Sequence, residues 1–385
     1  MRPLHGIRVL DLSRLIPGPF ATLVLADLGA QVDKIEDAGA GDYLRFFPPL
    51  CGDVSAGFHL LNRDKRSAVI DLKKPEGKAA FLGLLAGYDV LVEQFRPGVM
   101  DRLGLSHASL RERFPRLVIC AVTGYGQDGP YASQAGHDLN FLARAGLLGA
   151  MGPADGPPQV PGFQLADVSG AMWAVIAILA ALRQRDATGQ GSVCDVAMSE
   201  GALGFAALSL AGGMAGVTEP RGEGLLTGGI APYRTYLTED GQAVALAALE
   251  PKFWATFCAG VGLACDGEAL VPGPHQAALI ERLAATFASR TRDEWRAFGA
   301  AHDCCLTVVV RPEELRADPH LQARGVLFEL EDRGVTIPEV RMPVTPRDAT
   351  HTVAPTPGRD TRAIFRDAGL NDDAIDALLA ARAIA

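Results

Sequence analysis

The stretch from Ile7-Arg8-Val9-Leu10-Asp11-Leu12 to Val32-Asp33-Lys34-Ile35-Glu36 decides the fold class. The first of these segments is an apolar strand core, and the second is predicted to be another strand. Between them, the turn Pro17-Gly18-Pro19 opens a run of apolar residues at helical spacing, and Gly29 closes it. A strand, a helix and a second strand in this order predict a βαβ unit, and therefore a parallel sheet.

The same alternation continues for about 200 residues. Strands are predicted at residues 67–72, 90–95 and 117–123, with a helix at 76–85. A loop rich in proline and glycine, residues 152–162, leads into a long apolar helix that runs through Leu182, and another helix is predicted over 198–211. We therefore expect an α/β fold with a Rossmann-like sheet.

The length of 385 residues favours two domains. Residues 1–212 are expected to form the first part of a large domain, 213–230 a linker, 231–330 a smaller α+β domain, and 331–385 a second linker with C-terminal helices. The small domain is predicted to hold strands at 233–237 and 243–249 and helices at 252–262, 276–289 and 292–300. The C-terminal helices are predicted at 359–368 and 372–383.

Composition narrows the function classes. The apolar share of 48% and the charged share of 21% are typical of a soluble globular protein, and the net charge of -9 argues against a nucleic-acid partner. The N-terminus shows no signal-peptide core, and the longest apolar run, residues 171–182, is too short to span a bilayer. We expect a cytoplasmic location and no membrane partner. Seven cysteines without a C-x-x-C pair predict no metal site.

Gly124-Tyr125-Gly126-Gln127-Asp128-Gly129 matches the G-x-G-x-x-G pattern of dinucleotide-binding turns. Pro130 follows where the diagnostic helix should begin, and the acidic residue expected about 20 positions later is missing. An active-site turn is the better interpretation.

Three polar residues are candidates for acid/base chemistry. His137 and Asp167 are unlike groups that can exchange protons near neutral pH, and moving a proton between the two faces of a carbon needs two such groups. The alternatives are a structural histidine and a helix-capping aspartate. Glu250 ends the apolar run 243–249, where a solvated loop residue is the simpler interpretation.

Several basic residues stand near predicted strand ends. They form either a solvated face or a pocket for an anionic cofactor with several phosphates. They are Arg63, Lys65, Arg66, Lys73, Arg96 and Arg102.

The motifs resemble those of the class III CoA-transferases, a family that includes the α-methylacyl-CoA racemases. The resemblance covers most of the chain and rests on short segments whose order and spacing match. They are Gly6–Leu12, Gly29–Val32, Lys65–Ser67, Asp89–Gly98, Arg102–Gly104, Thr123–Gln127 and Thr188–Gly191.

The resemblance implies an interlocked homodimer with a Rossmann-like large domain built from both termini. It implies no permanently bound cofactor, because coenzyme A (CoA) enters as part of the acyl-CoA substrate. Many relatives carry an arginine where this chain has Asp37, so a nearby basic residue is expected to substitute. The implied CoA contacts are Leu15, Ile16, Asp71, Leu72, Lys73, Gln94, Phe95, Arg96, Arg102, Gly136 and Asp138.

The resemblance also gives roles to the three candidates. Asp167 takes the position that serves as nucleophile in the transferases and as acid/base in the racemases, while His137 and Glu250 match the racemase partners. The residues thus favour racemisation of a 2-methylacyl-CoA, with backbone amides at the start of the Asp167 helix stabilising the enolate oxygen. The alternatives are CoA transfer between carboxylic acids through an aspartyl anhydride, and a non-catalytic CoA-binding or regulatory protein.

Overall fold

The structure, a computed structural model, describes residues 2–217, 219–265 and 267–385. The chain divides into two compact units. Unit 1 consists of Met1–Ala145, Phe163–Gly204 and Pro319–Ala385, and unit 2 of Gly146–Gly162 and Phe205–Asp318. The predicted domain limits of 1–212, 213–230, 231–330 and 331–385 stay a prediction.

Unit 1 is built on a six-stranded sheet in the order β5-β2-β1-β6-β7-β8, in which every neighbouring pair is parallel. The predicted α/β class with a parallel sheet is therefore confirmed. The strands are β1 (Arg8–Asp11), β2 (Gln31–Glu36), β5 (Lys65–Val69), β6 (Val90–Glu93), β7 (Val118–Thr123) and β8 (Val193–Ala197).

Helices cover this sheet. The main ones are α1 (Pro17–Asp27), α3 (Pro75–Leu85), α5 (His107–Arg113), α6 (Asp138–Arg144), α8 (Leu165–Thr188), α9 (Met198–Leu203), α15 (Thr361–Asp367) and α16 (Asp372–Ala380). Side chains of α3, α5, α15 and α16 form one buried cluster with Leu10, Leu91 and Ile119 of the sheet. Helices α1 and α8 pack against each other and against β1 and β7.

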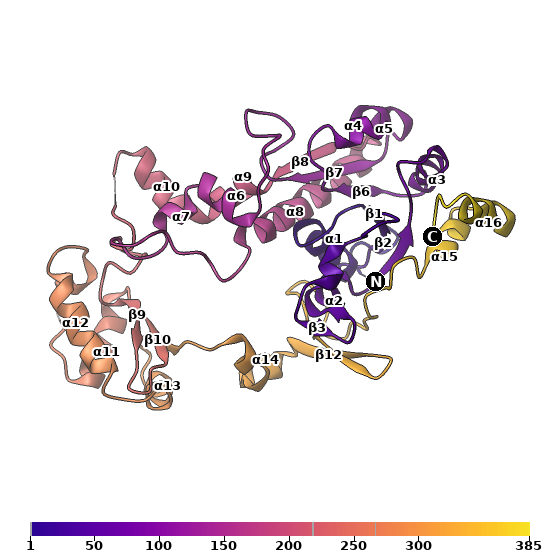
Figure 1. The fold of residues 1–385 in the computed structure, drawn as a ribbon. Coiled ribbons are helices and arrows are strands. Elements are labelled where there is room, and N and C mark those ends of the chain that lie inside the picture. Colours follow the sequence, from indigo (N-terminus) through magenta and orange to yellow (C-terminus); the bar gives the residue numbers. More distant parts are fainter. Residues whose placement is uncertain (1, 218, 266) are drawn as a thin grey trace. The chain divides into compact units, whose positions relative to one another are not determined.

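The C-terminal helices pack beside the N-terminal part of the chain, next to α3 (Figure 1). Ile364 and Phe365 of α15 are fully buried in the same cluster as Phe81 of α3. Beyond α16, Ile384 forms an isolated bridge with Ile70, and the Ala385 N–H donates to the Val69 carbonyl. Residues more than 280 positions apart thus share one core.

Short elements complete unit 1. Two of them, β12 and β13, pair as an antiparallel hairpin. The elements are a 3-10 helix at Tyr43–Phe46, β3 (Leu50–Cys51), β4 (Val54–Ser55), α2 (Ala56–Asn62), α4 (Val99–Arg102), α14 (Pro319–Arg324), β12 (Leu327–Asp332) and β13 (Val335–Val340).

Unit 2 has a three-stranded antiparallel sheet in the order β11-β10-β9. Its core is aromatic, with Trp254, Phe257, Phe287 and Trp295 all fully buried. The elements are α7 (Leu147–Ala150), α10 (Ala207–Met214), β9 (Tyr233–Leu237), β10 (Ala243–Ala247), α11 (Pro251–Val261), α12 (Gln276–Phe287), α13 (Arg292–Ala301) and β11 (Leu306–Val308), with 3-10 turns at Gly267–Leu270 and Pro312–Ala317.

Two predictions about helices are wrong. The helix expected over 198–211 is interrupted by a 3-10 turn at Gly204–Ala206, where unit 1 gives way to unit 2. The apolar run 171–182 lies inside α8, which has 24 residues and is long and apolar enough, by length and composition, to cross a membrane. Half of its most apolar stretch is buried, as in a core helix, so the expected absence of a membrane partner stays a prediction.

Candidate active site

The parallel strands of unit 1 all end at one edge of the sheet, which we call the carboxyl edge. From β1 the chain moves to β2 on one side, and β6, β7 and β8 follow on the other side of β1. Ligands of open α/β sheets bind at such a switch point, beyond the carboxyl ends of the two strands that border it. Leu15 and Ile16 follow β1 and Gln94, Phe95 and Arg96 follow β6, so the structure brings these predicted CoA contacts to one place.

The backbone at this point is unusual. Leu15 has φ 63°, a left-handed conformation that bulky residues rarely adopt and that is concentrated at functional sites. The Gln94 side chain accepts a hydrogen bond from the Gly18 N–H at the start of α1 (3.1 Å). A Cβ on Gly18 would overlap the Ser13 side chain, so only glycine permits this close approach.

Three of the six basic residues are not available to a phosphate. Arg63 and Lys65 are fully buried, and Arg66 is partly buried. Arg63 pairs with Asp27 (2.5 Å), Lys65 with Asp11 (3.3 Å) and Arg66 with Asp33 (2.6 Å). The prediction that these three belong to a solvated face or an anion pocket is wrong, because acidic side chains from distant positions neutralise them inside the protein.

The other three basic residues, Lys73, Arg96 and Arg102, are exposed. Lys73 follows β5 in the segment that also holds Asp71 and Leu72. The Asp71 carboxylate accepts from the Lys73 N–H (3.0 Å), and Leu72 packs on the core. Exposed cations at the carboxyl edge are what recognition of several phosphates needs.

Asp37 follows β2 and is exposed. Its carboxylate accepts from the Gly39 N–H (2.7 Å), so it shapes its own turn. Of the nearby basic side chains, Arg45 is buried against Glu36 and the Phe58 ring. Arg14 is exposed, with its guanidinium 5.2 Å from the centre of the Tyr43 ring. Arg14 is therefore the better candidate to substitute for the arginine expected at position 37.

His137 stands immediately before α6. It is exposed and is the N-cap residue of that helix, and its N–H donates to the Asn140 side chain (3.1 Å). Gly136 lies close to the Phe141 ring of α6 and to the turn beyond β7, since a Cβ there would lie 2.7 Å from that ring and 3.2 Å from the Tyr125 hydroxyl.

Asp167 lies in the first turn of α8, and the following turn packs directly beyond β8, since a Cβ on Gly170 would lie 2.6 Å from the Met198 side chain. Its carboxyl is half-buried, and burial, followed by the negative charge of Asp138, raises its pKa to about 7. A carboxyl group with this pKa is present both as acid and as base at neutral pH.

Asp138 connects the His137 turn to Asp167. Its Oδ1 accepts hydrogen bonds from the backbone N–H groups of Ala166 (2.7 Å) and Asp167 (3.1 Å). The prediction that amides at the start of this helix stabilise an enolate oxygen is wrong for these two, because both already donate to a carboxylate. The predicted contact of Asp138 with CoA stays a prediction.

Glu250 belongs to unit 2. It is the exposed N-cap residue of α11, and its carbonyl accepts from the Phe253 and Trp254 N–H groups. Its predicted support of His137, which lies in unit 1, stays a prediction.

A cavity of about 490 Å³ opens beside the turn that follows β7. Tyr125, Tyr131 and Arg144 are among its lining residues, and the Tyr125 ring packs edge-on against Phe141 (5.2 Å between ring centres). The sequence predicts an active-site turn here but gives Tyr125 no role. Its position directly beyond a strand at the carboxyl edge was the signal that could have singled it out.

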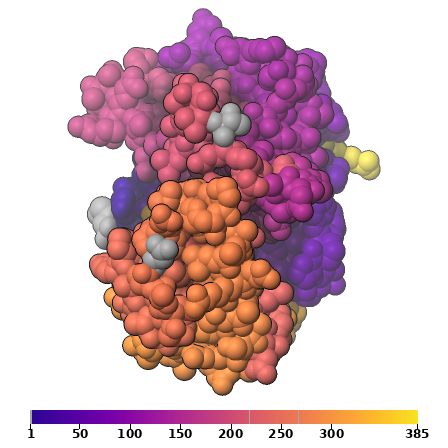
Figure 2. Space-filling view, turned by 90° about the vertical axis from the view of Figure 1, so that its left-hand side faces the viewer, coloured from indigo at the N-terminus to yellow at the C-terminus, as the bar shows by residue number. Residues whose placement is uncertain are grey.

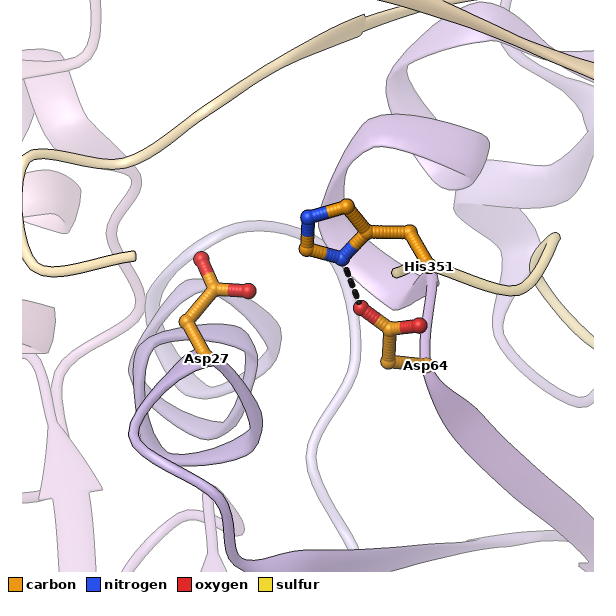
Figure 3. A group of neighbouring side chains, drawn as sticks. All are labelled: Asp27, Asp64 and His351. Carbon is orange, nitrogen blue, oxygen red and sulfur yellow. Dashed lines mark hydrogen bonds and ion pairs between the residues drawn. The ribbon is translucent and has the colours of Figure 1, made fainter. Parts of the chain in front are cut away.

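Asp27, Asp64 and His351 bring their ligand atoms within 4.8 Å of one another, close enough to suggest a metal site (Figure 3). His351 is hydrogen-bonded to Asp64 (2.6 Å). The Arg63 guanidinium, however, pairs with both Asp27 (2.5 Å) and Asp64 (3.0 Å). An arginine side chain thus supplies the positive charge at this place, and the donors do not fit a metal ion.

The family model described as CoA-transferase family III matches residues 4–361. The chain belongs to CoA-transferase family III. The resemblance based on the motifs is confirmed, and, as this family acts on CoA thioesters, CoA is part of its substrate.

Relatives within CoA-transferase family III catalyse two kinds of reaction. "Alpha-methylacyl-CoA racemase" of Homo sapiens is 35% identical over 381 residues, 97% of this chain and 95% of that one. "Succinate--glutarate CoA-transferase" of Agrobacterium fabrum is 33% identical over 357 residues, 89% of each chain. The crystal structure of a CAIB/BAIF family protein from Brucella suis superposes with a TM-score of 0.82 at 30% identity, covering 95% and 99% of the two chains.

Proposed function

We propose that this family III enzyme racemises 2-methylacyl-CoA thioesters. The observation that carries the proposal is the Asp167 carboxyl, whose pKa of about 7 results from burial and the adjacent Asp138 charge. An acid/base residue must change protonation state in each turnover, and this pKa suits that task. The similarity to a racemase over 97% of the chain supports the same reaction.

In the proposed reaction the α-carbon lies between His137 and Asp167. In one direction neutral His137 removes the α-proton, the C–H electron pair moves into the thioester carbonyl, and protonated Asp167 donates a proton to the opposite face. In the other direction ionised Asp167 is the base and protonated His137 is the acid. Glu250 orients His137 in this proposal.

CoA binds at the carboxyl edge in this proposal. Exposed Lys73, Arg96 and Arg102 hold phosphates. The acyl group meets exposed apolar side chains near the Asp167 end of α8, namely Phe163, Met172 and Trp173. The further proposed contacts are Leu15, Ile16, Asp71, Leu72, Gln94, Phe95, Gly136 and Asp138.

CoA transfer between carboxylic acids is the second candidate, supported by the transferase relative that covers 89% of the chain. Ionised Asp167 would attack the thioester carbonyl, expel the CoA thiolate and form a mixed anhydride. The thiolate would then attack the aspartyl carbonyl and release the first acid, and a second acid would finally collect the CoA. A carboxyl with a pKa of about 7 is only partly ionised at neutral pH, which favours racemisation.

We further propose a cytoplasmic homodimer. Apolar side chains of unit 2 are exposed around α10, with Leu208 73% and Met214 81% exposed, and such side chains are typical of a protein interface. This segment, coloured between magenta and salmon, lies at the surface on the face shown in Figure 2. Sedimentation should give about twice the chain mass of 40.6 kDa.

The experiment is incubation with one enantiomer of a 2-methylacyl-CoA in deuterated water, with succinate added to a parallel sample. Racemisation predicts α-deuterium uptake with inversion at the α-carbon. The rate of this uptake should fall at least 100-fold in Asp167→Asn and in His137→Ala. Formation of succinyl-CoA without deuterium uptake would overturn racemisation in favour of CoA transfer. CoA binding without either product would leave a non-catalytic role.

A further inference from the structure

Helix α8 does not cap its own N-terminus. The first amides of a helix have no partner within it and need an acceptor from elsewhere. Gln164, the N-cap residue of α8, makes no side-chain capping hydrogen bond. The amides of Ala166 and Asp167, the second and third residues of α8, therefore depend on another acceptor.

Asp138 is that acceptor, and it comes from a different helix. Its Oδ1 lies 2.7 Å from the Ala166 nitrogen and 3.1 Å from the Asp167 nitrogen. Asp138 is also the first residue of α6 and directly follows His137. One carboxylate thus ties the backbone of Asp167 to the turn that carries His137.

We propose that Asp138 is a positioning residue that caps α8 from α6 and fixes the spacing between the two acid/base side chains. This inference rests on the proposed function of His137 and Asp167. Because Asp138 is bonded to the backbone of one and is the chain neighbour of the other, its capping bonds are a direct mechanical link between them.

The charge of Asp138 gives it a second effect. A helix N-terminus ordinarily stabilises a carboxylate in its first turn and lowers its pKa. In α8 the Asp138 carboxylate occupies that favourable position, and its negative charge adds to burial in raising the pKa of Asp167. Asp138 therefore favours the protonated form of Asp167.

Other charged groups on the helices and strands packed against α8 do not have this effect. They are Asp27 on α1, Arg144 on α6, Glu200 on α9 and Asp195 on β8. Asp27 pairs with Arg63, and the Arg144 guanidinium lies over the Tyr131 ring. Among the described residues, Asp138 is the charged group that shifts the pKa of Asp167.

Two substitutions at this position separate capping from charge. Asp138→Asn keeps an acceptor oxygen but removes the charge, whereas Asp138→Ala removes both. Asp186→Asn is the matched control, because Asp186 is an exposed aspartate near the other end of α8. Each full-length protein is assayed for hydrogen exchange at the amides of 166 and 167, for the titration midpoint of Asp167 by carboxyl ¹³C NMR, and for α-deuterium exchange.

We expect Asp138→Asn to protect both amides as the unsubstituted protein does and to lower the Asp167 midpoint by about 1 pH unit. In Asp138→Ala the amides of 166 and 167 should no longer be protected. The rate of α-deuterium exchange in the substrate should fall about 10- to 100-fold at every pH. The control should match the unsubstituted protein in all three measurements.

Unchanged amide protection in Asp138→Ala would overturn the capping role. Equal rates of α-deuterium exchange in the substrate for Asp138→Asn and Asp138→Ala would overturn the positioning role. An unchanged midpoint in Asp138→Asn would overturn the effect of charge. The first and third results need no turnover. If the unsubstituted protein shows no deuterium exchange, the proposed function fails, while amide protection and the midpoint still test Asp138.

Discussion

Exposure divides the basic residues near the carboxyl edge into two groups with different roles. Arg63, Lys65 and Arg66 are held by acidic partners, whereas Arg96 and Arg102 face solvent. The sequence places all of them near strand ends, and nothing local distinguishes the groups. Asp27, the partner of Arg63, and Asp33, the partner of Arg66, stand more than 30 positions away from these arginines, so only the folded chain reveals the pairs.

Replacing Arg96 or Arg102 by alanine should weaken CoA binding about tenfold each, because each change removes one charge-assisted contact to phosphate. Isothermal titration with CoA measures the change in Kd. Arg183→Ala is the control, because Arg183 is an exposed arginine in the C-terminal half of α8, the end that leads back to the start of β8. Equal Kd values for all three variants would argue against the proposed CoA site.

At the scale of elements, α3 provides a test of how closely the helices pack on the sheet. Gly77 in its first turn is buried, and a Cβ there would overlap the carbonyl oxygen of Asp71 beyond β5. Gly83 near the other end of the helix is exposed and has open space around it. The two glycines therefore differ in packing but share the same helix.

Gly77→Ala should lower the free energy of unfolding by roughly 1–3 kcal/mol, because backbone has to move to admit the methyl group. Gly83→Ala should raise it by roughly 0.5–1 kcal/mol, the gain for alanine over glycine in a helix. Urea denaturation measures both. A neutral Gly77→Ala would mean that α3 is not held against the segment beyond β5.

Several elements could be predicted from the sequence because a strong local pattern specifies them. β1, β6 and β7 contain apolar runs and β2 follows the glycine that closes the first helix, and the structure forms all four within two residues of the predicted limits. β8 was missed because only Val196 and Ala197 of its five residues are buried, so its pattern is weak. The sequence does not predict the β12–β13 hairpin. Its tight turn requires positive φ, and the structure gives positive φ to both Arg333 and Gly334.

The candidate site was predictable in its residue types but not in its connections. The sequence points to His137 and Asp167 because each supplies a proton-transfer group next to a predicted turn or helix. The bond from Asp138 to the start of α8 joins residues 28 and 29 positions apart. No spacing rule predicts such a bond, since it depends on how two helices meet in space.

At the scale of the whole molecule, buried Arg63 ties the C-terminal part of unit 1 to its N-terminal part. It pairs with Asp27 and Asp64 and lies 3.5 Å from Glu339 of β13. Three carboxyl groups thus surround one guanidinium. Burial, the largest effect, raises the pKa of Glu339 to about 8 and outweighs the attraction of Arg63. Glu339 is therefore protonated in the folded protein at neutral pH.

This arrangement makes stability depend on pH. Below pH 4.5 Glu339 is protonated in both folded and unfolded chains, and its contribution is complete. As the pH rises to about 8, the unfolded chain releases a proton that the folded chain retains, so stability is lost. Glu339→Gln cannot ionise and should therefore be more stable than the unsubstituted protein at pH 8, by on the order of 4 kcal/mol, but not at pH 4.5.

Thermal unfolding from pH 4.5 to 8 measures this difference. Glu331→Gln is the control, because Glu331 is exposed on the neighbouring strand β12. If Glu339→Gln and the unsubstituted protein lose stability in parallel with rising pH, another group is responsible for the loss.

The core shared by the N-terminal and C-terminal parts of the chain also limits when unit 1 can finish folding during synthesis. Phe81 and Leu84 emerge from the ribosome early, but Ile364 and Phe365, which cover them, are translated about 280 residues later. At about 5–20 residues per second, this interval lasts roughly 15–60 seconds. Unit 2 is synthesised within that interval and has its own core. It can therefore fold before α15 and α16 have been synthesised and have completed the core of unit 1.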